Sequence, residues 1–243
     1  MHRNICIFLI LVCQWTWAAA GIALDNTRLV YLSTAKSVDL TLSNMLAGPS
    51  RYLTWVDDGD PASTPENASA DFFVFPASGM LLQGRKQTVR VMFNGAKRPA
   101  DREAVYFLNV LELPQKVTPK DGQGAIAIAN RTRIKIFMRP ADLAADPAES
   151  AKKLTWEAHA LSDAPVFRAK NASPHFVSMR SVKLMQGGTE LADLGVSMVP
   201  PWGELEFRVE PQRANWSGVT TVKYVYVNDY GGNDEVTFTL PPR

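Results

Sequence analysis

Residues 125–140 read Ala-Ile-Ala-Ile-Ala-Asn-Arg-Thr-Arg-Ile-Lys-Ile-Phe-Met-Arg-Pro. The segment begins as an uncharged run that favours extended structure, turns basic at Arg131, Arg133 and Lys135, and stops at Pro140. An apolar strand at the edge of a sheet is an aggregation hazard, because its free N–H and C=O groups template another strand. We therefore expect this edge either to be buried or to pair with a strand from another protein.

Apolar and polar residues alternate with a period of two through most of the chain after Gly21. The alternation is clear in residues 38–43 and recurs at 88–93, 204–209 and 236–240. Such a pattern marks strands with one buried face. Further strand candidates are residues 28–32, 52–56, 72–75, 104–112, 154–158, 166–170, 176–184 and 219–227.

These strands are short, are separated by turn clusters such as 186–188, and are accompanied by no convincing amphipathic helix. The pattern predicts an all-β fold of antiparallel β-sandwiches. A polar, alanine-rich stretch at 141–153 is the one plausible linker, with room for a helical turn or two. We therefore expect an N-terminal domain of residues 21–143 and a C-terminal domain of residues 150–243.

The first twenty residues have the features of a secretory signal peptide. Arg3 supplies a positive charge, residues 5–12 an apolar stretch, and residues 18–20 a small-residue cleavage site. The apolar stretch is too short to span a bilayer; an N-terminal membrane anchor is the alternative interpretation. We therefore expect an exported protein, and because both cysteines lie in this segment, one without a disulfide.

The charge of the chain is nearly balanced. Removal of residues 1–20 takes one cation, Arg3, and no anion from a formal charge of +2, which leaves +1. A nearly neutral chain has no long-range attraction for nucleic acid. No stretch after residue 20 approaches the ~18 apolar residues of a membrane span, so we expect no membrane insertion.

Catalytic and metal-binding patterns are missing from the sequence. His159 and His175 have no metal-ligand spacing, and His159 fits an ordinary strand position. Asp57 and Asp58 lie in turn-like sequence, where we expect solvated surface charge. No nucleophile elbow, phosphate loop or dinucleotide fingerprint is present, which disfavours a hydrolase or any other enzyme.

Charged residues do interrupt strand-like sequence at five places. Lys135 lies between Ile134 and Ile136, a position that fits ordinary alternation. Taken singly, each of the five fits an outward-facing position or one half of an ion pair. They are Arg28, Glu103, Lys135, Arg139 and Asp229.

Taken in order, short motifs along the chain resemble those of the periplasmic pilus-assembly chaperones, the partners of outer-membrane ushers. The resemblance covers nearly the whole chain after residue 20, although Ala104 stands where the family's Asp-Arg-Glu-Ser signature has serine. The motifs are Thr27-Arg28, Asn44, Trp55-Val56-Asp57, Phe75-Pro76, Gly84, Gln87, Arg90, Asp101-Arg102-Glu103, Phe107-Leu108-Asn109, the segment 133–140 and the segment 228–232.

This resemblance implies a structure and a set of roles. Two immunoglobulin-like domains meet as a boomerang, and the strand that begins near Ala125 completes a pilus subunit that lacks one strand. Arg28 and Lys135 would hold the C-terminal carboxylate of that subunit. The family also implies an interdomain ion network, which maps to Glu103, Arg139 and Asp229, and it implies no cofactor.

The lent part of the strand maps to Ile126, Ile128 and Asn130. Ile126 and Ile128 lie two apart and would fill successive pockets of a groove, whereas Asn130 stands where a third apolar residue is usual. Strict alternation places Lys135 on the face opposite the two isoleucines. Either a bulge or strong twist intervenes, or the anchor and the lent residues use different faces.

An exported β-sandwich adhesin or carbohydrate-binding protein is the alternative interpretation. Such a protein would present an aromatic platform at one end of a sandwich. The tryptophans after residue 20 are instead scattered through both halves, at Trp55, Trp156, Trp202 and Trp216.

Overall fold

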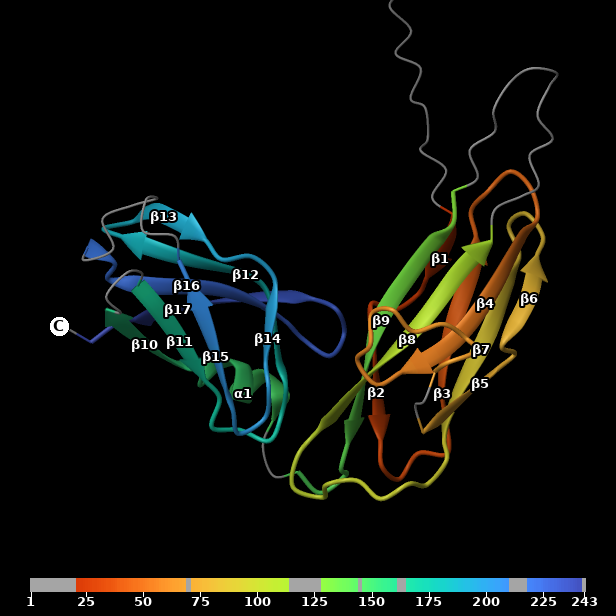
Figure 1. Cartoon of the computed structure of the whole chain (residues 1–243), viewed down its shortest axis with the longest axis horizontal. Helices are drawn as coiled ribbons and strands as arrows, with labels where there is room; N and C mark the ends of the chain where they lie inside the picture. Colours follow the sequence, from red (N-terminus) through yellow and green to blue (C-terminus); the bar gives the residue numbers. More distant parts are fainter. Residues whose placement is uncertain are drawn as a thin grey trace, which may run out of the picture.

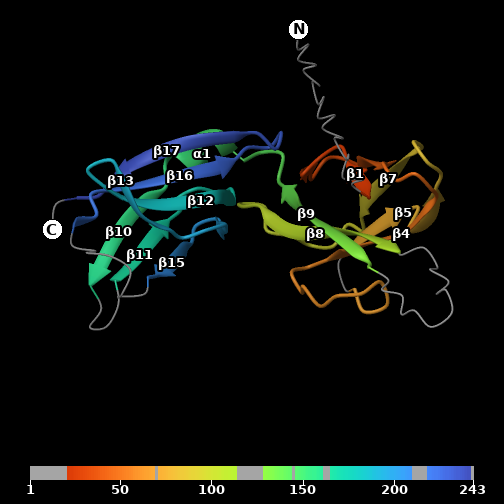
Figure 2. The ribbon, with the colours of Figure 1, turned by 90° about the horizontal axis from the view of Figure 1, so that it is seen from above.

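The computed structural model describes residues 21–68, 71–113, 128–143, 146–160, 165–209 and 218–241. The chain forms two β-sandwich domains whose strands run in different directions, so that the molecule is bent between them (Figure 1). Seen from above, the domains lie end to end, and the chain passes from one to the other after β9 (Figure 2). The predicted all-β, two-domain architecture is therefore confirmed.

Two sheets form the N-terminal domain. Their strand orders are β1-β3-β7-β5 and β2-β9-β8-β4-β6. The strands of the first sheet are β1 (Ile22–Leu24), β3 (Val38–Asn44), β7 (Lys86–Phe93) and β5 (Phe72–Phe75). Those of the second are β2 (Arg28–Leu32), β9 (Asn130–Arg139), β8 (Ala104–Leu113), β4 (Ser50–Asp57) and β6 (Ser78–Leu81).

The start of the chain passes from one sheet to the other. The pairing of β1 with β3 ends at Asp25. There the backbone N–H of Asp25 donates to Thr41 O at 3.2 Å, and Asp25 Oδ1 accepts from Thr41 N at 3.0 Å. Beyond it, β2 runs parallel to β9, with Arg28 opposite Lys135. The prediction of purely antiparallel sandwiches was wrong for this pair. Parallel strands need a long connection, and the intervening strands supply it here.

The alternating residues of the sequence form the core of the N-terminal domain. Leu40, Leu42, Val89 and Val91 are fully buried between the two sheets. On β9 the even-numbered Ile134, Ile136 and Met138 belong to the same core. The odd-numbered side chains of β9 therefore face outward, and these are the basic ones and Phe137.

Two sheets and one short helix form the C-terminal domain. One sheet has the order β10-β11-β15, and the other has the order β13-β12-β16-β17 with β14 paired to β12. The strands are β10 (Thr155–Ala160), β11 (Pro165–Lys170), β12 (Val177–Gln186), β13 (Thr189–Asp193), β14 (Ser197–Val199), β15 (Glu204–Arg208), β16 (Thr221–Val227) and β17 (Asn233–Thr239). Trp156 lies at the centre of the core, with its ring 5.5 Å from that of Phe207 and 5.8 Å from that of Tyr224.

The single helix of the described chain, α1 (Pro147–Lys152), lies in the stretch expected to link the domains. Asp146 caps it, because its Oδ1 accepts from the N–H of Ala148 at 2.7 Å and of Glu149 at 3.3 Å. Across the portion that the structure describes, no helix has the length and apolar character of a membrane span.

Candidate functional site between the two domains

The outward face of β9 carries the residues that meet the second domain. The register between β8 and β9 runs without interruption from Glu112 opposite Asn130 to Ala104 opposite Met138. No bulge therefore occurs in this part of β9, and alternation is strict. Within β9, Lys135 therefore lies on the face opposite the even-numbered residues.

Arg28 and Lys135 lie side by side, since they face each other in the parallel register of β2 and β9. Both reach across to the C-terminal domain. Arg28 Nη1 donates to Val227 O at 2.8 Å, and Lys135 Nζ donates to Ser178 Oγ at 3.0 Å. The structure thus brings together the two cations that the resemblance paired, at the junction of the domains.

Both cations have lowered pKa values. Burial and the nearby Arg28 charge lower the pKa of Lys135 to about 8. Burial likewise lowers the pKa of Arg28, and the charge of Asp229 partly opposes that shift. Within the described ranges Lys135 forms no ion pair, so the arrangement holds two close cations without a carboxylate on the lysine.

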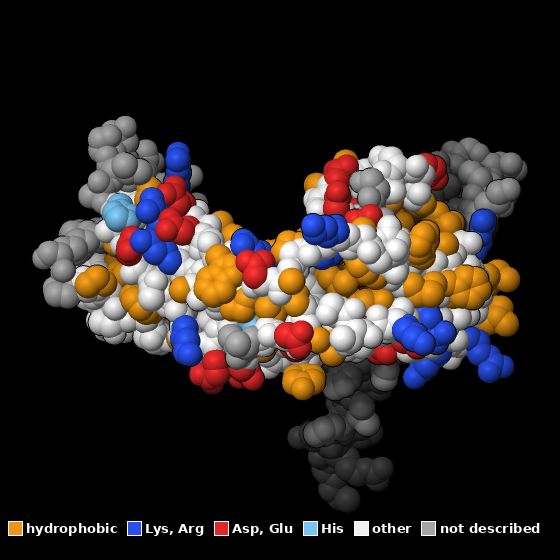
Figure 3. All heavy atoms as spheres, turned by 90° about the horizontal axis from the view of Figure 1, so that it is seen from below, with side chains coloured by type: hydrophobic (Ala, Val, Ile, Leu, Met, Phe, Trp, Pro, Cys, Tyr) orange, Lys and Arg blue, Asp and Glu red, His pale blue; other side chains and the backbone are white. Residues whose placement is uncertain are grey.

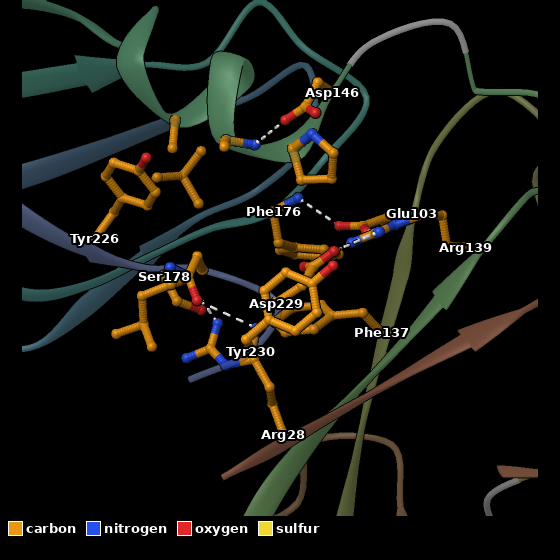
Figure 4. Close-up of a pocket in the computed structure, with 16 residues that line it drawn as sticks. Arg28, Glu103, Phe137, Arg139, Asp146, Phe176, Ser178, Tyr226, Asp229 and Tyr230 are labelled. Carbon is orange, nitrogen blue, oxygen red and sulfur yellow. Dashed lines mark hydrogen bonds and ion pairs between the residues drawn. The ribbon is translucent and has the colours of Figure 1, made fainter. Parts of the chain in front are cut away.

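A second cluster, also predicted from the resemblance, joins the domains beside this pair. Arg139 Nε donates to Glu103 Oε1 at 2.6 Å, and its two terminal nitrogens donate to Asp229 at 2.6 and 2.9 Å (Figure 4). The N–H of Phe176 donates to Glu103 Oε2 at 2.8 Å. The structure thus joins Glu103, Arg139 and Asp229 in one hydrogen-bonded ion network across the interface.

Burial and close contacts within this network shift the pKa values of Glu103 and Arg139. Burial of Glu103, whose side chain is 1 % exposed, raises its pKa against the opposing effect of Arg139. Burial alone would lower the pKa of Arg139. Its hydrogen bonds with Asp229 and Glu103, together with their charges, outweigh that effect and raise the pKa. An ion pair of this kind leaves a costly buried charge if one member is removed.

A small pocket opens between the two clusters. Its volume is about 180 Å³, and its walls include Arg28, Phe176, Ser178 and the exposed Tyr230 (Figure 4). The Phe137 ring lies 6.1 Å from that of Phe176 and 5.8 Å from the Arg28 guanidinium carbon. The molecular surface is hollowed between the two lobes (Figure 3).

The residues expected to be lent to a partner lie at the other end of β9. Ile126 lies outside the described residues. Ile128 is 78 % exposed just before the strand, and Asn130 is the exposed first residue of β9. Because β2 begins to pair at Lys135, residues 130–134 have a neighbour, β8, on one side only among the described strands.

Asp57 corrects an expectation drawn from the sequence. We expected solvated charge at Asp57 and Asp58, but the Asp57 side chain is 1 % exposed and bonds to groups from several strands. Asp58 is exposed as expected. A turn-like sequence indicates where the chain reverses, but it does not tell whether other strands cover the turn.

His159 and His175 do not form a site. His159 lies on β10 beside Glu157, whereas His175 is buried with its Nδ1 3.2 Å from Ser150 Oγ. Burial lowers the pKa of His175 to about 4, and Arg139 adds to that effect. Among the residues that the structure covers, no group of three or more His, Cys, Asp or Glu side chains has the arrangement of a metal site.

Comparison with known proteins identifies the family. The N-terminal domain family described as "Pili and flagellar-assembly chaperone, PapD N-terminal domain" matches residues 21–144. The corresponding family "Pili assembly chaperone PapD, C-terminal domain" matches residues 149–238. The chain belongs to the pilus-assembly chaperones. This membership favours a chaperone over the exported adhesin, and it assigns the protein to a class of assembly factors and not of enzymes.

Relatives of the chaperone align over nearly its whole length. It is 31 % identical to a probable fimbrial chaperone, YadV, of Escherichia coli K12, over 88 % of this chain and 87 % of that protein. It is 29 % identical to the chaperone protein FimB/FhaD of Bordetella pertussis, over 88 % and 86 %. The crystal structure of the CupB2 chaperone of Pseudomonas aeruginosa superposes with a TM-score of 0.72 at 30 % identity, over 90 % and 100 %.

Proposed function

We propose that this chaperone acts in the periplasm, where it captures pilus subunits that lack one strand, shields them from aggregation and delivers them to an outer-membrane usher. One observation carries the proposal. Two half-buried cations, Arg28 and Lys135, lie together where the domains meet, on a strand whose first half pairs on one side only among the described strands.

The cation pair has the donors to hold a carboxylate. An ammonium has three N–H donors and Ser178 accepts one, while a guanidinium has five and Val227 accepts one. A terminal carboxylate between them would gain charge-assisted hydrogen bonds from both cations. Its negative charge would also offset the burial and the Arg28 charge that together lower the pKa of Lys135.

The free edge of β9 supplies the second half of the mechanism. A foreign strand that pairs with residues 130–134 gains main-chain hydrogen bonds that depend little on its sequence. Continuation of the alternation places Ile128 on the same face as Ile134, which is the face that an incomplete subunit needs to fill its groove. An anchored carboxylate sets the register, since a slip of one residue would turn every side chain to the other face.

The test is substitution of the cation pair in the full chain. Lys135→Ala is expected to weaken capture of a pilus subunit about 30-fold, since a hydrogen bond to a charged group contributes ~2 kcal/mol. The double variant with Arg28→Ala is expected to abolish co-purification. Thermal unfolding should stay nearly unchanged, because Lys135 gives up only its bond to Ser178 and its buried charge.

Lys183→Ala is the matched control, because Lys183 pairs with Glu190 on the surface of the C-terminal domain, within β12 and β13. It should capture subunits like the unmodified chain. Normal capture by the Arg28 and Lys135 double variant would refute the anchor.

A further inference from the structure

We propose that Asp57, with Arg131 and Arg133, forms a clamp that holds the free half of β9 in place for a partner strand. These are positioning residues, and the proposal rests on the proposed function. It concerns a different group of side chains from the anchor, farther toward the start of β9 on the same outward face of that strand.

The clamp is built around a carboxylate that is almost fully buried. The Asp57 side chain is 1 % exposed. It accepts from Gly59 N at 2.8 Å, Asn109 Nδ2 at 2.7 Å, Ser63 Oγ at 3.2 Å and Arg133 Nε at 3.1 Å. Although burial opposes the charge, these bonds, led by that of Arg133, hold the pKa of Asp57 below its usual value.

Two arginines connect β9 to that carboxylate. Arg133 forms a close ion pair with Asp57, and Arg131 Nη2 lies 3.7 Å from Asp57 Oδ2. Arg131 also donates to Asn109 Oδ1 at 2.9 Å and to Pro61 O at 2.8 Å.

Each arginine is also packed on an aromatic ring. The guanidinium carbon of Arg131 lies 4.9 Å from the Trp55 ring centre, and that of Arg133 lies 3.7 Å from the Phe107 ring centre. These contacts hold the two guanidinium groups against β4 and β8. Because both arginines belong to β9, the contacts also hold β9 in place beside these strands.

The position of the clamp along β9 indicates its purpose. Residues 135–139 of β9 are held on both sides, by β2 and by β8. Among the described strands, residues 130–134 pair only with β8, and both clamp arginines lie in this half. A strand with one neighbour frays more readily than one with two, and the side-chain bonds compensate for the missing strand while leaving its edge open.

The clamp also fixes the register and the face of the strand. A slip of one residue would turn Arg131 and Arg133 into the apolar core and break their bonds with Asp57. The spacing between Lys135 and Ile128 is then constant before a subunit arrives. Preorganisation of this kind reduces the ordering cost of association.

The test uses Asp57→Asn, which keeps the shape of the side chain and removes its charge. We expect faster hydrogen exchange at the amides of residues 130–134, and subunit capture that is slower by about tenfold. Arg133→Met serves as a second variant that removes the strand side of the clamp, should Asp57→Asn fold poorly. Asp39→Asn is the matched control, because Asp39 pairs with exposed Arg90 on the opposite sheet.

A separate variant distinguishes clamping from a general loss of stability. Val89→Ala opens a cavity in the core of the same domain on β7, in the sheet that does not contain β9. At a temperature where both variants are folded, it should retain normal capture, whereas the clamp variants should not. Equal capture by the clamp variants and the unmodified chain would overturn the proposal.

The anchor variant Lys135→Ala separates this proposal from the proposed function. If it loses capture while the clamp variants capture normally, the clamp alone is wrong. If it captures normally, the proposed function is wrong.

Discussion

Lys135 shows how a side chain acquires a role from its neighbours. Its position between two buried isoleucines is that of any outward residue on a strand. Arg28 on the next strand and Ser178 on the other domain change its environment, because they bring a second charge and a cover of protein. The result is an ammonium whose pKa has fallen to about 8.

Capture should therefore depend on pH. As pH rises through 8, Lys135 of the free chaperone loses its proton, and its attraction for a carboxylate disappears. We expect affinity for a subunit to be constant below about pH 7 and to fall above pH 8, with the Lys135→Arg variant flat because arginine stays charged. Titration of binding by calorimetry or by fluorescence anisotropy measures this.

The stability of the free chaperone should move the other way. An unfolded chain keeps this lysine protonated up to its ordinary pKa of 10.5, so between pH 8 and 10.5 the unfolded state binds more protons. The contribution of Lys135 to stability then rises with pH over that window.

A pH-independent affinity in the unmodified chain would show that Lys135 does not bind the subunit.

At the scale of the element, β9 is one strand with neighbours that change along its length. Its inner half is paired on both sides and faces the second domain through Lys135, Phe137 and Arg139. Its outer half is paired on one side and bonded through its arginines to Asp57. One continuous backbone therefore connects an anchored end to an open one.

Ile128→Asp tests the open end. Ile128 is 78 % exposed, so the free chaperone should unfold at an unchanged temperature, whereas a charge placed in an apolar groove should cost capture ~2 kcal/mol or more. Val196→Asp is the control, since Val196 is 77 % exposed on the C-terminal domain. Capture is measured by co-purification with a subunit and by suppression of its aggregation. If Ile128→Asp captures as well as Val196→Asp, the donor segment lies elsewhere.

The strands themselves were largely predictable. Alternation in residues 38–43 and 88–93 marked β3 and β7, whose apolar members are fully buried. Strands β1, β6, β13 and β14, of three to five residues each, were missed, because they contain few of the β-branched and aromatic residues that mark the equally short β2 and β5. Helix α1 was foreseen only as a turn or two within the linker.

The site was predictable only in part from the residues themselves. From the alternation, Lys135 was predicted only to be an ordinary outward-facing lysine. Its pairing with Arg28 was predicted from the family resemblance. Nothing in the local sequence of Asp57 indicated burial, because its donors come from Asn109 and Arg133 on other strands. Likewise, Ser178 contacts the site only because the second domain folds against the first.

At the scale of the whole molecule, the two domains meet through polar contacts around a small aromatic centre. A main-chain bond from Glu103 N to Pro174 O, at 2.9 Å, adds to the bonds of Arg139 with Asp229. Phe137 and Phe176 lie between them and the cation pair. Such an interface fixes an angle through directional bonds more than through buried area.

Arg139→Ala should loosen the two domains. It leaves Glu103 buried with an unpaired charge, which costs roughly 3 kcal/mol or more, and it frees Asp229. We expect a larger radius of gyration and a broader distance distribution in small-angle scattering, and a lower unfolding temperature. Arg168→Ala is the control, because Arg168 pairs with Glu204 and Glu206 within the C-terminal domain. An unaltered profile for Arg139→Ala would count against the network.

The parallel pairing of β2 with β9 has a consequence for how the chain acquires its shape. Arg28 and Lys135 belong to adjacent strands but are synthesised about a hundred residues apart, and closing so long a loop slows folding. β2 must therefore wait, unpaired, until nearly the whole N-terminal domain has been made. In chain order β9 is also the last strand of its sheet, so a chain that ends before it leaves both β2 and β8 with an open side.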